Sequence, residues 1–235
     1  MILSTPGLVL HTTPYGEAAV VAKVFTRQLG MRSYLVKGVR SQRGRVRQNL
    51  LQPLSCVDMV VYDSPKRDLN YIKELSPRRP EPPADAVGNA LRFFMTEVLY
   101  KALREEEPMP DLFDYVESVS SLLSDPAAQP AVLPLRFLLA LTHHLGVEPL
   151  DNHSPREPLF DVQEGCFVAT PSETTLPPAL SAMLHEYLSE PEAQPRGYSS
   201  SDRRALLDAL IAYCQLHFSG FRNIHSHEIL HTILR

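Results

Sequence analysis

A proline-rich segment divides the chain into two parts with different hydrophobic patterns. Residues 76–83 read Ser-Pro-Arg-Arg-Pro-Glu-Pro-Pro, and four prolines in seven residues can continue neither a sheet nor the interior of a helix. Before this segment the apolar residues alternate, as in strands, and after it they recur at the spacing of a helix. The sequence therefore predicts an α+β protein, with a domain of strands at residues 1–79 and an α-helical domain at residues 84–235.

Short runs with a strand pattern follow one another through the first part, with Gly and Pro between them. We expect strands at residues 8–13, 17–26, 31–39, 50–62 and 69–75. Five short strands in a segment of this length favour a small closed barrel. Such a barrel has the proportions of an OB-fold, which is a common platform for oligonucleotides.

The second part has the helical period almost throughout. We expect helices at residues 84–104, 111–123, 131–145, 178–188, 201–218 and 226–234. Ser201 is the predicted N-cap of the fifth of these helices. Residues 150–171 break the pattern and predict a small irregular insert, with a hairpin at residues 160–168.

The net charge of −4 conceals an uneven distribution along the chain. Residues 1–80 hold 13 basic and 5 acidic residues, whereas residues 81–235 hold 10 basic and 22 acidic residues. A basic front and an acidic rear indicate different partners for the two parts. We expect a polyanion at the first part and a basic, apolar or protein partner at the second.

One stretch of the first part carries most of its positive charge. Eight Lys and Arg residues and no acidic residue lie between Glu17 and Asp58. Unrelieved repulsion of this kind favours an external polyanion, and nucleic acid is the commonest one in a cell; the alternative is a solvated, charged loop. Arg43, Arg45 and Arg47 alternate with small residues, so an extended arm would place all three on one face. The residues expected to bind nucleic acid are Lys23, Arg32, Tyr34, Lys37, Arg40, Arg43, Arg45 and Arg47.

The aromatic residues of the basic part have two possible roles. Tyr15, Phe25 and Tyr34 can each stack on a base, but the core or rim of the barrel is the more common place for such a residue. The three cysteines, Cys56, Cys166 and Cys214, are far apart and fit a reduced cytosol. The chain begins without a signal-peptide pattern and has no apolar run long enough to span a membrane, so we expect a cytoplasmic protein.

A zinc-protease motif occurs near the end of the chain. His227-Glu228-Ile-Leu-His231 has the H-E-x-x-H spacing, which on a helix sets two imidazoles one turn apart beside a carboxylate. A catalytic zinc needs a third protein ligand, and only four residues follow His231. No phosphate-binding glycine loop and no nucleophile elbow is present. We therefore expect a binding protein and not an enzyme, with no cofactor and no metal, and keep the metalloprotease as a remote alternative.

The order of several short motifs is similar to that of the RecO family of bacterial recombination mediators. The most specific part is a Lys-Gly-x-Arg segment followed at this spacing by Leu-Gln-Pro-Leu. The motifs that carry the resemblance are Tyr15-Gly-Glu17, Phe25-Thr26, Gly30, Val36-Lys-Gly-Val-Arg40, Leu51-Gln-Pro-Leu54, Leu135-Arg-Phe137, His144-Leu-Gly146, Pro149, Leu159-Phe-Asp161 and Ile224-His-Ser-His-Glu-Ile-Leu230. They extend over nearly the whole chain.

The resemblance implies an OB-fold followed by an α-helical domain, and a function in DNA repair and recombination. It implies binding of single- and double-stranded DNA, annealing of complementary strands, and help in loading the recombinase RecA on DNA coated by single-stranded-DNA-binding protein. The implied partners are RecR and the acidic, apolar C-terminal tail of the coating protein. The implied place of action is the nucleoid.

Two residue-level expectations accompany the resemblance. Arg136, on an apolar helix, is a candidate clamp for the acidic tail, and an internal ion pair is the alternative. Many members of the family hold a four-cysteine zinc knuckle, but residues 150–171 offer only His153 and Cys166, so we expect no metal there. An RNA-binding OB-fold protein of translation or RNA turnover remains the main alternative function, because a grip on the backbone does not separate DNA from RNA.

Overall fold

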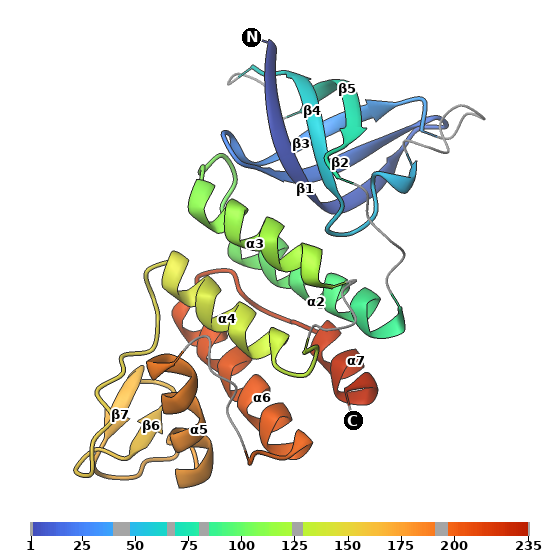
Figure 1. Cartoon of the computed structure of the whole chain (residues 1–235). Coiled ribbons are helices and arrows are strands. Elements are labelled where there is room, and N and C mark those ends of the chain that lie inside the picture. The colour runs from blue at the N-terminus through green and yellow to red at the C-terminus, as the bar shows by residue number, and fades with distance from the viewer. Residues whose placement is uncertain are drawn as a thin grey trace. The chain divides into compact units, whose positions relative to one another are not determined.

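The structure is a computed structural model that describes residues 2–39, 48–64, 69–79, 85–123, 129–190 and 197–234 (Figure 1). These residues form seven strands and six helices. Close contacts group the chain into two compact units, Met1–Ala128 and Gln129–Arg235. The first two helices therefore belong to the same unit as the barrel, although the proline-rich segment separates them from it in sequence.

Five strands of the first unit close into a barrel in the order β1-β2-β3-β5-β4 (Figure 1). Neighbouring strands are antiparallel except β3 and β5, which are parallel. The predicted five-stranded OB-like barrel is thus confirmed. The strands are β1 (Ile2–Tyr15), β2 (Ala19–Thr26), β3 (Gly30–Lys37), β4 (Cys56–Tyr62) and β5 (Asn70–Pro77).

Alternate residues of each strand face the interior, as the sequence pattern predicted. On β4, Val57, Met59 and Val61 are buried. They pack in one cluster with Val24 of β2 and Tyr34 of β3. Residues of the opposite parity therefore form the outer surface of the barrel, which is the surface that a ligand or another element can reach.

Two boundaries differ from the prediction. β1 begins at Ile2 and not at residue 8, because its first residues pair with β4. Residues 50–55 are not strand, because Leu54 has a positive φ of 61° and its N–H donates to the carbonyl of Val9 at 2.7 Å. This left-handed residue turns the chain before β4 begins at Cys56.

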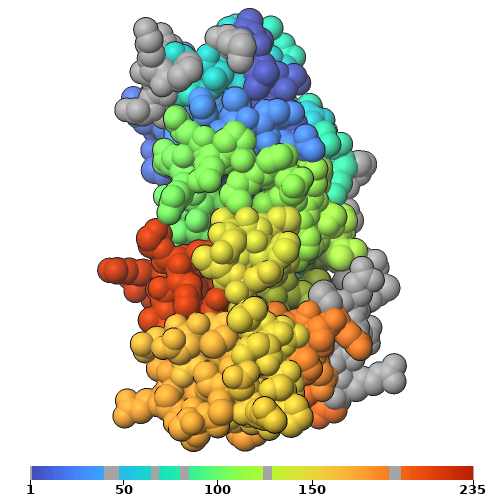
Figure 2. Space-filling model, turned by 90° about the vertical axis from the view of Figure 1, so that its left-hand side faces the viewer, coloured from blue at the N-terminus to red at the C-terminus, as the bar shows by residue number. Residues whose placement is uncertain are grey.

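The first two helices, α2 (Ala86–Ala102) and α3 (Pro110–Leu122), complete the first unit. The carboxylate of Asp85 caps α2 by accepting from the N–H of Gly88 at 2.7 Å. Figure 2 shows the barrel residues, in blue, and these helices, in green, packed against one another. The Phe25 ring of β2 and the Phe113 ring of α3 are fully buried with centroids 5.6 Å apart, so an apolar contact joins the outer face of the barrel to α3.

A glycine allows the link between the two helices to approach the barrel. Gly30 has φ of 68°, and a Cβ added there would lie 2.4 Å from the carbonyl oxygen of Glu107. Beside it, the N–H of Glu106 donates to the carbonyl of Met31 at 3.0 Å. A larger residue at position 30 would push this link away from β3.

The second unit contains four helices and a small hairpin among its described residues (Figure 1). Contacts join α4 to α6, and α5 to both α6 and the hairpin. The hairpin confirms the prediction for residues 160–168. The elements are α4 (Leu133–His144), β6 (Leu159–Asp161), β7 (Cys166–Val168), α5 (Pro178–Ser189), α6 (Ser200–His217) and α7 (Ser226–Ile233).

The predicted N-cap of α6 was wrong by two residues. Ser199 is the cap, and its hydroxyl accepts from the N–H of Asp202 while the Asp202 carboxylate accepts from the N–H of Ser199 at 2.8 Å. This reciprocal pair is a capping box with Asp in place of the usual Glu. Ser201 therefore lies inside the helix and not at its start.

Candidate nucleic-acid interface

Lys37 is the predicted DNA-binding residue that the structure places on an exposed surface. It is the last residue of β3, and its ammonium group lies 5.4 Å from the centroid of the Tyr71 ring on β5. A cation over an aromatic ring at this distance is attracted by the negative face of the ring. The interaction leaves the Lys37 side chain at the outer surface, where it can meet a phosphate.

Two other predicted cations are paired inside the first unit. The guanidinium of Arg32 meets the carboxylate of Asp63 at 2.5 Å, and their side chains are 12% and 6% exposed. The ammonium of Lys23 is paired with the carboxylate of Glu105. Because their charges are already neutralised by carboxylates of the chain, we remove Arg32 and Lys23 from the set that contacts DNA.

Tyr34 is also removed from that set, because it is a core residue. Its side chain is fully buried in the barrel, and this burial raises the pKa of its hydroxyl. Phe25 is buried as well, whereas Tyr15 at the end of β1 is 55% exposed. Of the three aromatic residues considered for stacking, only Tyr15 can therefore meet a base.

The remaining predicted residues, Arg40, Arg43, Arg45 and Arg47, lie outside the described residues. They belong to the segment that connects β3 to β4, and they follow Lys37 directly in the sequence. Their assignment to DNA binding stays a prediction.

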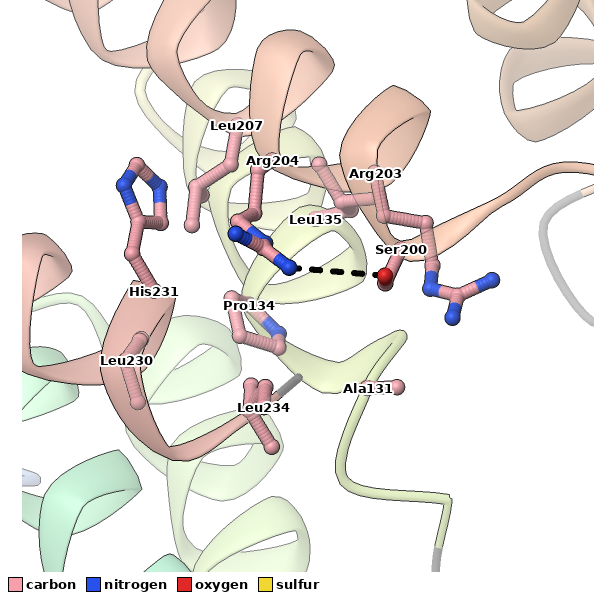
Figure 3. Close-up of a pocket in the computed structure, with 10 residues that line it drawn as sticks. All are labelled: Ala131, Pro134, Leu135, Ser200, Arg203, Arg204, Leu207, Leu230, His231 and Leu234. Atoms are coloured by element: carbon pink, nitrogen blue, oxygen red, sulfur yellow. Dashed lines mark hydrogen bonds between the residues drawn. The ribbon is translucent and has the colours of Figure 1, made fainter.

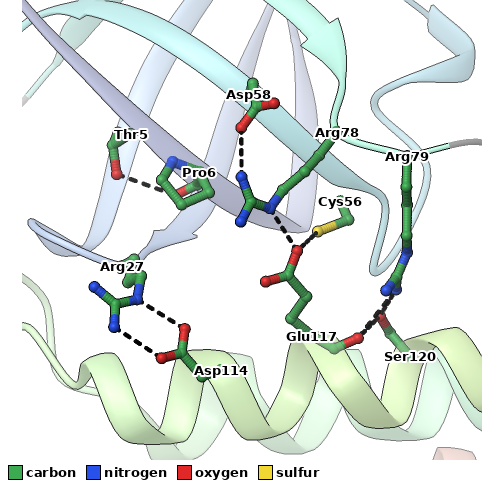
Figure 4. A network of polar contacts seen from close by, with 10 residues as sticks. All are labelled: Thr5, Pro6, Arg27, Cys56, Asp58, Arg78, Arg79, Asp114, Glu117 and Ser120. Carbon is green, nitrogen blue, oxygen red and sulfur yellow. Dashed lines mark hydrogen bonds and ion pairs between the residues drawn. The ribbon is translucent and has the colours of Figure 1, made fainter.

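A second group of arginines joins the barrel to α3 (Figure 4). The guanidinium of Arg27 donates to both carboxylate oxygens of Asp114, at 2.7 and 2.8 Å. Arg78 donates to Glu117 at 2.6 Å and to Asp58 at 2.9 Å. Arg79 donates to the carbonyl of Glu117 at 3.0 Å and to the hydroxyl of Ser120. Sequence reasoning missed this network, because no local signal relates an arginine to a carboxylate tens of residues away.

The same contacts shift the pKa values of the two carboxyl groups on α3. The hydrogen bond from Arg27 lowers the pKa of Asp114. Burial acts to raise the pKa of Glu117, but hydrogen bonds from Arg78 and from the Cys56 thiol, which lies 3.1 Å away, lower it overall. Both groups are therefore held in the charged form that the arginines need.

The second unit has a shallow pocket formed by α4, α6 and α7 (Figure 3). Leu135, Leu207 and Leu230 supply apolar walls, and Arg203 and Arg204 bring positive charge from the first turns of α6. Figure 3 shows Arg204 directed one turn back along α6 to the hydroxyl of Ser200, at 3.4 Å.

Arg136 lies close to this pocket, because it follows the lining residue Leu135 on α4. Burial raises the pKa of the hydroxyl of Tyr187 on α5. The positive charges of Arg136 and Arg203 act in the opposite direction and lower that pKa. The cations that line the pocket are Arg203 and Arg204, and the assignment of Arg136 as a clamp stays a prediction. Such a surface suits a peptide that is both acidic and apolar.

The H-E-x-x-H motif lies on α7, as predicted, but its geometry differs from a metal site. The rings of His227 and His231 are 5.5 Å apart and perpendicular. His231 meets Asp208 of α6 at 3.2 Å, and Glu228 is exposed. Among the residues that the structure describes, no group of three His, Cys, Asp or Glu residues is close enough to hold a metal ion. The arrangement therefore gives the protease alternative no support.

Hydrogen bonds hold the insert where a zinc knuckle was considered. The amide of Asn152 accepts from the N–H of Phe167 at 2.7 Å and donates to its carbonyl at 2.9 Å. His153 stacks on His185 of α5 with ring centroids 4.2 Å apart. Asp161 is nearly buried; desolvation acts to raise its pKa, but hydrogen bonds, first from Ser172, lower it overall.

The fold defines the class of the protein: a five-stranded OB-like barrel followed by a helical region. Comparison with known proteins agrees with this class. Residues 1–80 match the family model described as recombination protein O N terminal, and residues 83–223 match the model described as recombination protein O C terminal. The chain therefore belongs to the RecO family of DNA repair proteins.

Similar curated proteins have the same family name. The chain is 32% identical to the DNA repair protein RecO of Phocaeicola vulgatus over 171 residues, which cover 72% of this chain and 71% of the relative. It is 29% identical to that of Porphyromonas gingivalis and 27% identical to that of Christiangramia forsetii, and each alignment covers 99% of both chains. No helix in the described part of the chain is long and apolar enough to cross a membrane.

Proposed function

We propose that the chain is a recombination mediator that binds single- and double-stranded DNA through the phosphate backbone. In this proposal it anneals complementary strands and helps to load the recombinase on single-stranded DNA that is coated by single-stranded-DNA-binding protein. RecR and the coating protein are its proposed direct partners and RecA an indirect one. The proposed place of action is the nucleoid, in the cytoplasm.

The observation that carries the proposal is a closed barrel whose β3–β4 connection holds four arginines and no acidic residue. Lys37 stands at the start of this connection on the outer surface. With Lys23 and Arg32 assigned to internal ion pairs, the proposed contact set is Lys37, Arg40, Arg43, Arg45 and Arg47. These residues contact phosphates and carry no information about base sequence.

The number of residues in this smaller set predicts how steeply the affinity for DNA falls with salt concentration. Each phosphate contact with a single strand contributes about −0.7 to the slope of log K against log salt concentration, because counterions are released. Five contacts give a slope of about −3.5. A slope near zero for binding of a single-stranded oligonucleotide would contradict a backbone grip.

Charge reversal of Arg43, Arg45 and Arg47 to Glu tests the residues themselves. We expect the triple variant to lose detectable binding of both single- and double-stranded DNA in a fluorescence anisotropy titration. The matched control reverses Arg104, Arg156 and Arg222, which are exposed and change the net charge by the same amount. If the two triple variants bind equally well, net charge and not the β3–β4 connection governs binding.

Annealing follows from the same electrostatics. A surface that neutralises phosphates lets two strands approach, and base pairing then supplies the free energy. An assay with complementary strands coated by single-stranded-DNA-binding protein, at two salt concentrations, tests this step. We expect annealing to be slower at the higher salt concentration, in parallel with the loss of affinity. Competition with RNA oligonucleotides of the same length separates this function from the RNA-binding alternative.

The pocket of the second unit supports the proposed contact with the tail of the coating protein. Its leucines suit an apolar terminal side chain, and Arg203 and Arg204 supply charge for the acidic residues and the terminal carboxylate. Arg136, which follows the lining residue Leu135 on α4, is the proposed clamp. We expect a peptide that ends in Asp-Ile-Pro-Phe to be captured by the wild type and lost with Arg136→Ala. Arg156→Ala, on the exposed part of the insert, is the matched control. Equal capture by all three would exclude Arg136 from the contact.

A further inference from the structure

The outer face of the barrel carries a row of apolar and aromatic residues that crosses five strands. Each member is the direct cross-strand partner of the next. All have the parity that faces outward, because their neighbours along each strand belong to the core cluster. In spatial order the row is Val21 of β2, Leu35 of β3, Tyr71 of β5, Tyr62 of β4 and Ile2 of β1. We call it the outer row.

Two tyrosines form the centre of the outer row. Tyr62 and Tyr71 stand opposite each other on antiparallel strands, so their Cβ atoms are about 5 Å apart on one face. Tyr62 is 46% exposed, and Ile2 beside it is 57% exposed. Leu35 is only 7% exposed, so the exposed part of the outer row is the neighbouring pair of Tyr62 and Ile2. Single exposed apolar side chains are ordinary, whereas neighbouring ones more often mark a binding surface.

A described cation lies beside the two tyrosines. Lys37 lies over the Tyr71 ring at 5.4 Å, and the outer row itself contains no carboxylate. Two acids that the structure describes near this pair are ion-paired: Asp63 meets Arg32 inside the barrel, and Glu74 meets Lys73 at 3.3 Å. An aromatic pair beside a cation is the combination that binds single-stranded nucleic acid, because the rings stack on bases while cations hold phosphates.

We propose that Tyr62 and Tyr71 form a stacking platform for unpaired bases of single-stranded DNA, next to a phosphate held by Lys37. The inference rests on the proposed function and adds a second kind of contact to it. Base pairs in a duplex are stacked on one another and do not offer their faces. The platform therefore favours single strands over duplexes, whereas the arginines bind both.

An abasic oligonucleotide separates stacking from the backbone grip. It has the same phosphates as oligothymidylate of equal length but no bases. We expect the wild type to bind oligothymidylate about tenfold more tightly than the abasic strand, within the range for base–aromatic stacking. The double variant Tyr62→Ala/Tyr71→Ala is expected to lose this preference while its affinity for the abasic strand and its salt slope stay unchanged.

Two control variants complete the experiment. The double variant Tyr62→Phe/Tyr71→Phe keeps both rings and is expected to keep the preference. Tyr100→Ala removes a tyrosine of α2 that is 40% exposed and lies outside the outer row, and it is also expected to keep the preference. The unchanged affinity of the Ala double variant for the abasic strand serves as its folding control.

Each result that contradicts the proposal has a distinct meaning. Equal affinity of the wild type for the two oligonucleotides overturns the stacking platform and leaves the backbone grip intact. A preference that survives in the Ala double variant assigns the outer row to a protein partner and also overturns the platform. Equal loss of affinity for both strands in that variant would show a structural role for the tyrosines. If the wild type binds neither oligonucleotide, the proposed function fails together with the inference.

Discussion

The barrel has two outer surfaces on which the cations have different partners. On the surface that faces α3, Arg27 and Arg78 each meet a carboxylate of that helix, and the Phe25 and Phe113 rings are buried against each other. On the outer row, Lys37 meets an aromatic ring, and Tyr62 stays half exposed. The cations of the first surface are paired with carboxylates of the chain, whereas the second surface is the one at which we propose that single-stranded DNA binds. The number of cations in a segment therefore does not by itself identify a binding surface.

The largest expected difference between the two surfaces is in stability. Phe113→Ala removes a fully buried ring from the α3 surface and is expected to lower the free energy of unfolding by about 3–5 kcal/mol. Tyr62→Ala, on the outer row, is expected to cost less than about 1 kcal/mol because its side chain is 46% exposed. Urea unfolding followed by circular dichroism measures both. Similar losses in the two variants would show that the outer row is as structural as the α3 surface.

A charged residue from each surface gives the next difference. Arg78→Met leaves the carboxylate of Glu117, which is 19% exposed, without its main donor. We expect a loss of about 2 kcal/mol in the free energy of unfolding, which is typical for a hydrogen bond to a charged group. Lys37→Met is the matched control, with an expected change of about 0.5 kcal/mol, because an exposed cation–π contact contributes little. A larger cost for Lys37→Met than for Arg78→Met would reverse the comparison.

The barrel was predictable because alternation in the sequence sets the burial of each strand. Val57, Met59 and Val61 face the core as their spacing indicates. The first residues of β1 were missed because Thr5, Pro6 and Gly7 weaken the pattern, and pairing with β4 overrides that weakness. Leu54 was misread as strand because its left-handed backbone depends on a hydrogen bond to Val9, which is distant in sequence.

The candidate site was less predictable, because its composition depends on strand register and on distant partners. Arg32 looks like any other cation of the basic stretch until Asp63 is placed beside it. Tyr62 and Tyr71 carry no local signal, and they become a pair only when β4 and β5 are aligned. A single sequence shows which residues are charged or aromatic. It does not show which of them are already in contact with other residues of the folded chain.

The dependence of stability on pH is expected to come from the α3 surface. A hydrogen bond from Arg27 lowers the pKa of Asp114 below its value in the unfolded chain. Burial acts to raise the pKa of Glu117, but hydrogen bonds lower it below its unfolded value overall. Their contribution is therefore complete above the unfolded pKa values of 3.8 and 4.5, and is lost as the pH falls through the lowered folded values. Urea midpoints measured between pH 3 and pH 7 should decrease toward acid, and Glu117→Gln should make that decrease shallower. An unchanged acid limb in this variant would mean that Glu117 is not held by Arg78 in solution.

The smallest expected effect is the coupling between Arg27 and Asp114. Both side chains are largely exposed, at 40% and 48%, so water screens their attraction although the hydrogen bonds have good geometry. A double-mutant cycle with Arg27→Met and Asp114→Asn should show a small favourable coupling at low salt. The coupling should disappear in 1 M salt, where the screening length is about 3 Å. A coupling that persists in 1 M salt would mean that this pair is shielded from solvent. The α3 surface would then hold its arginines as firmly at the rim as it does at Arg78, and the two surfaces of the barrel would differ even more than their exposed fractions indicate.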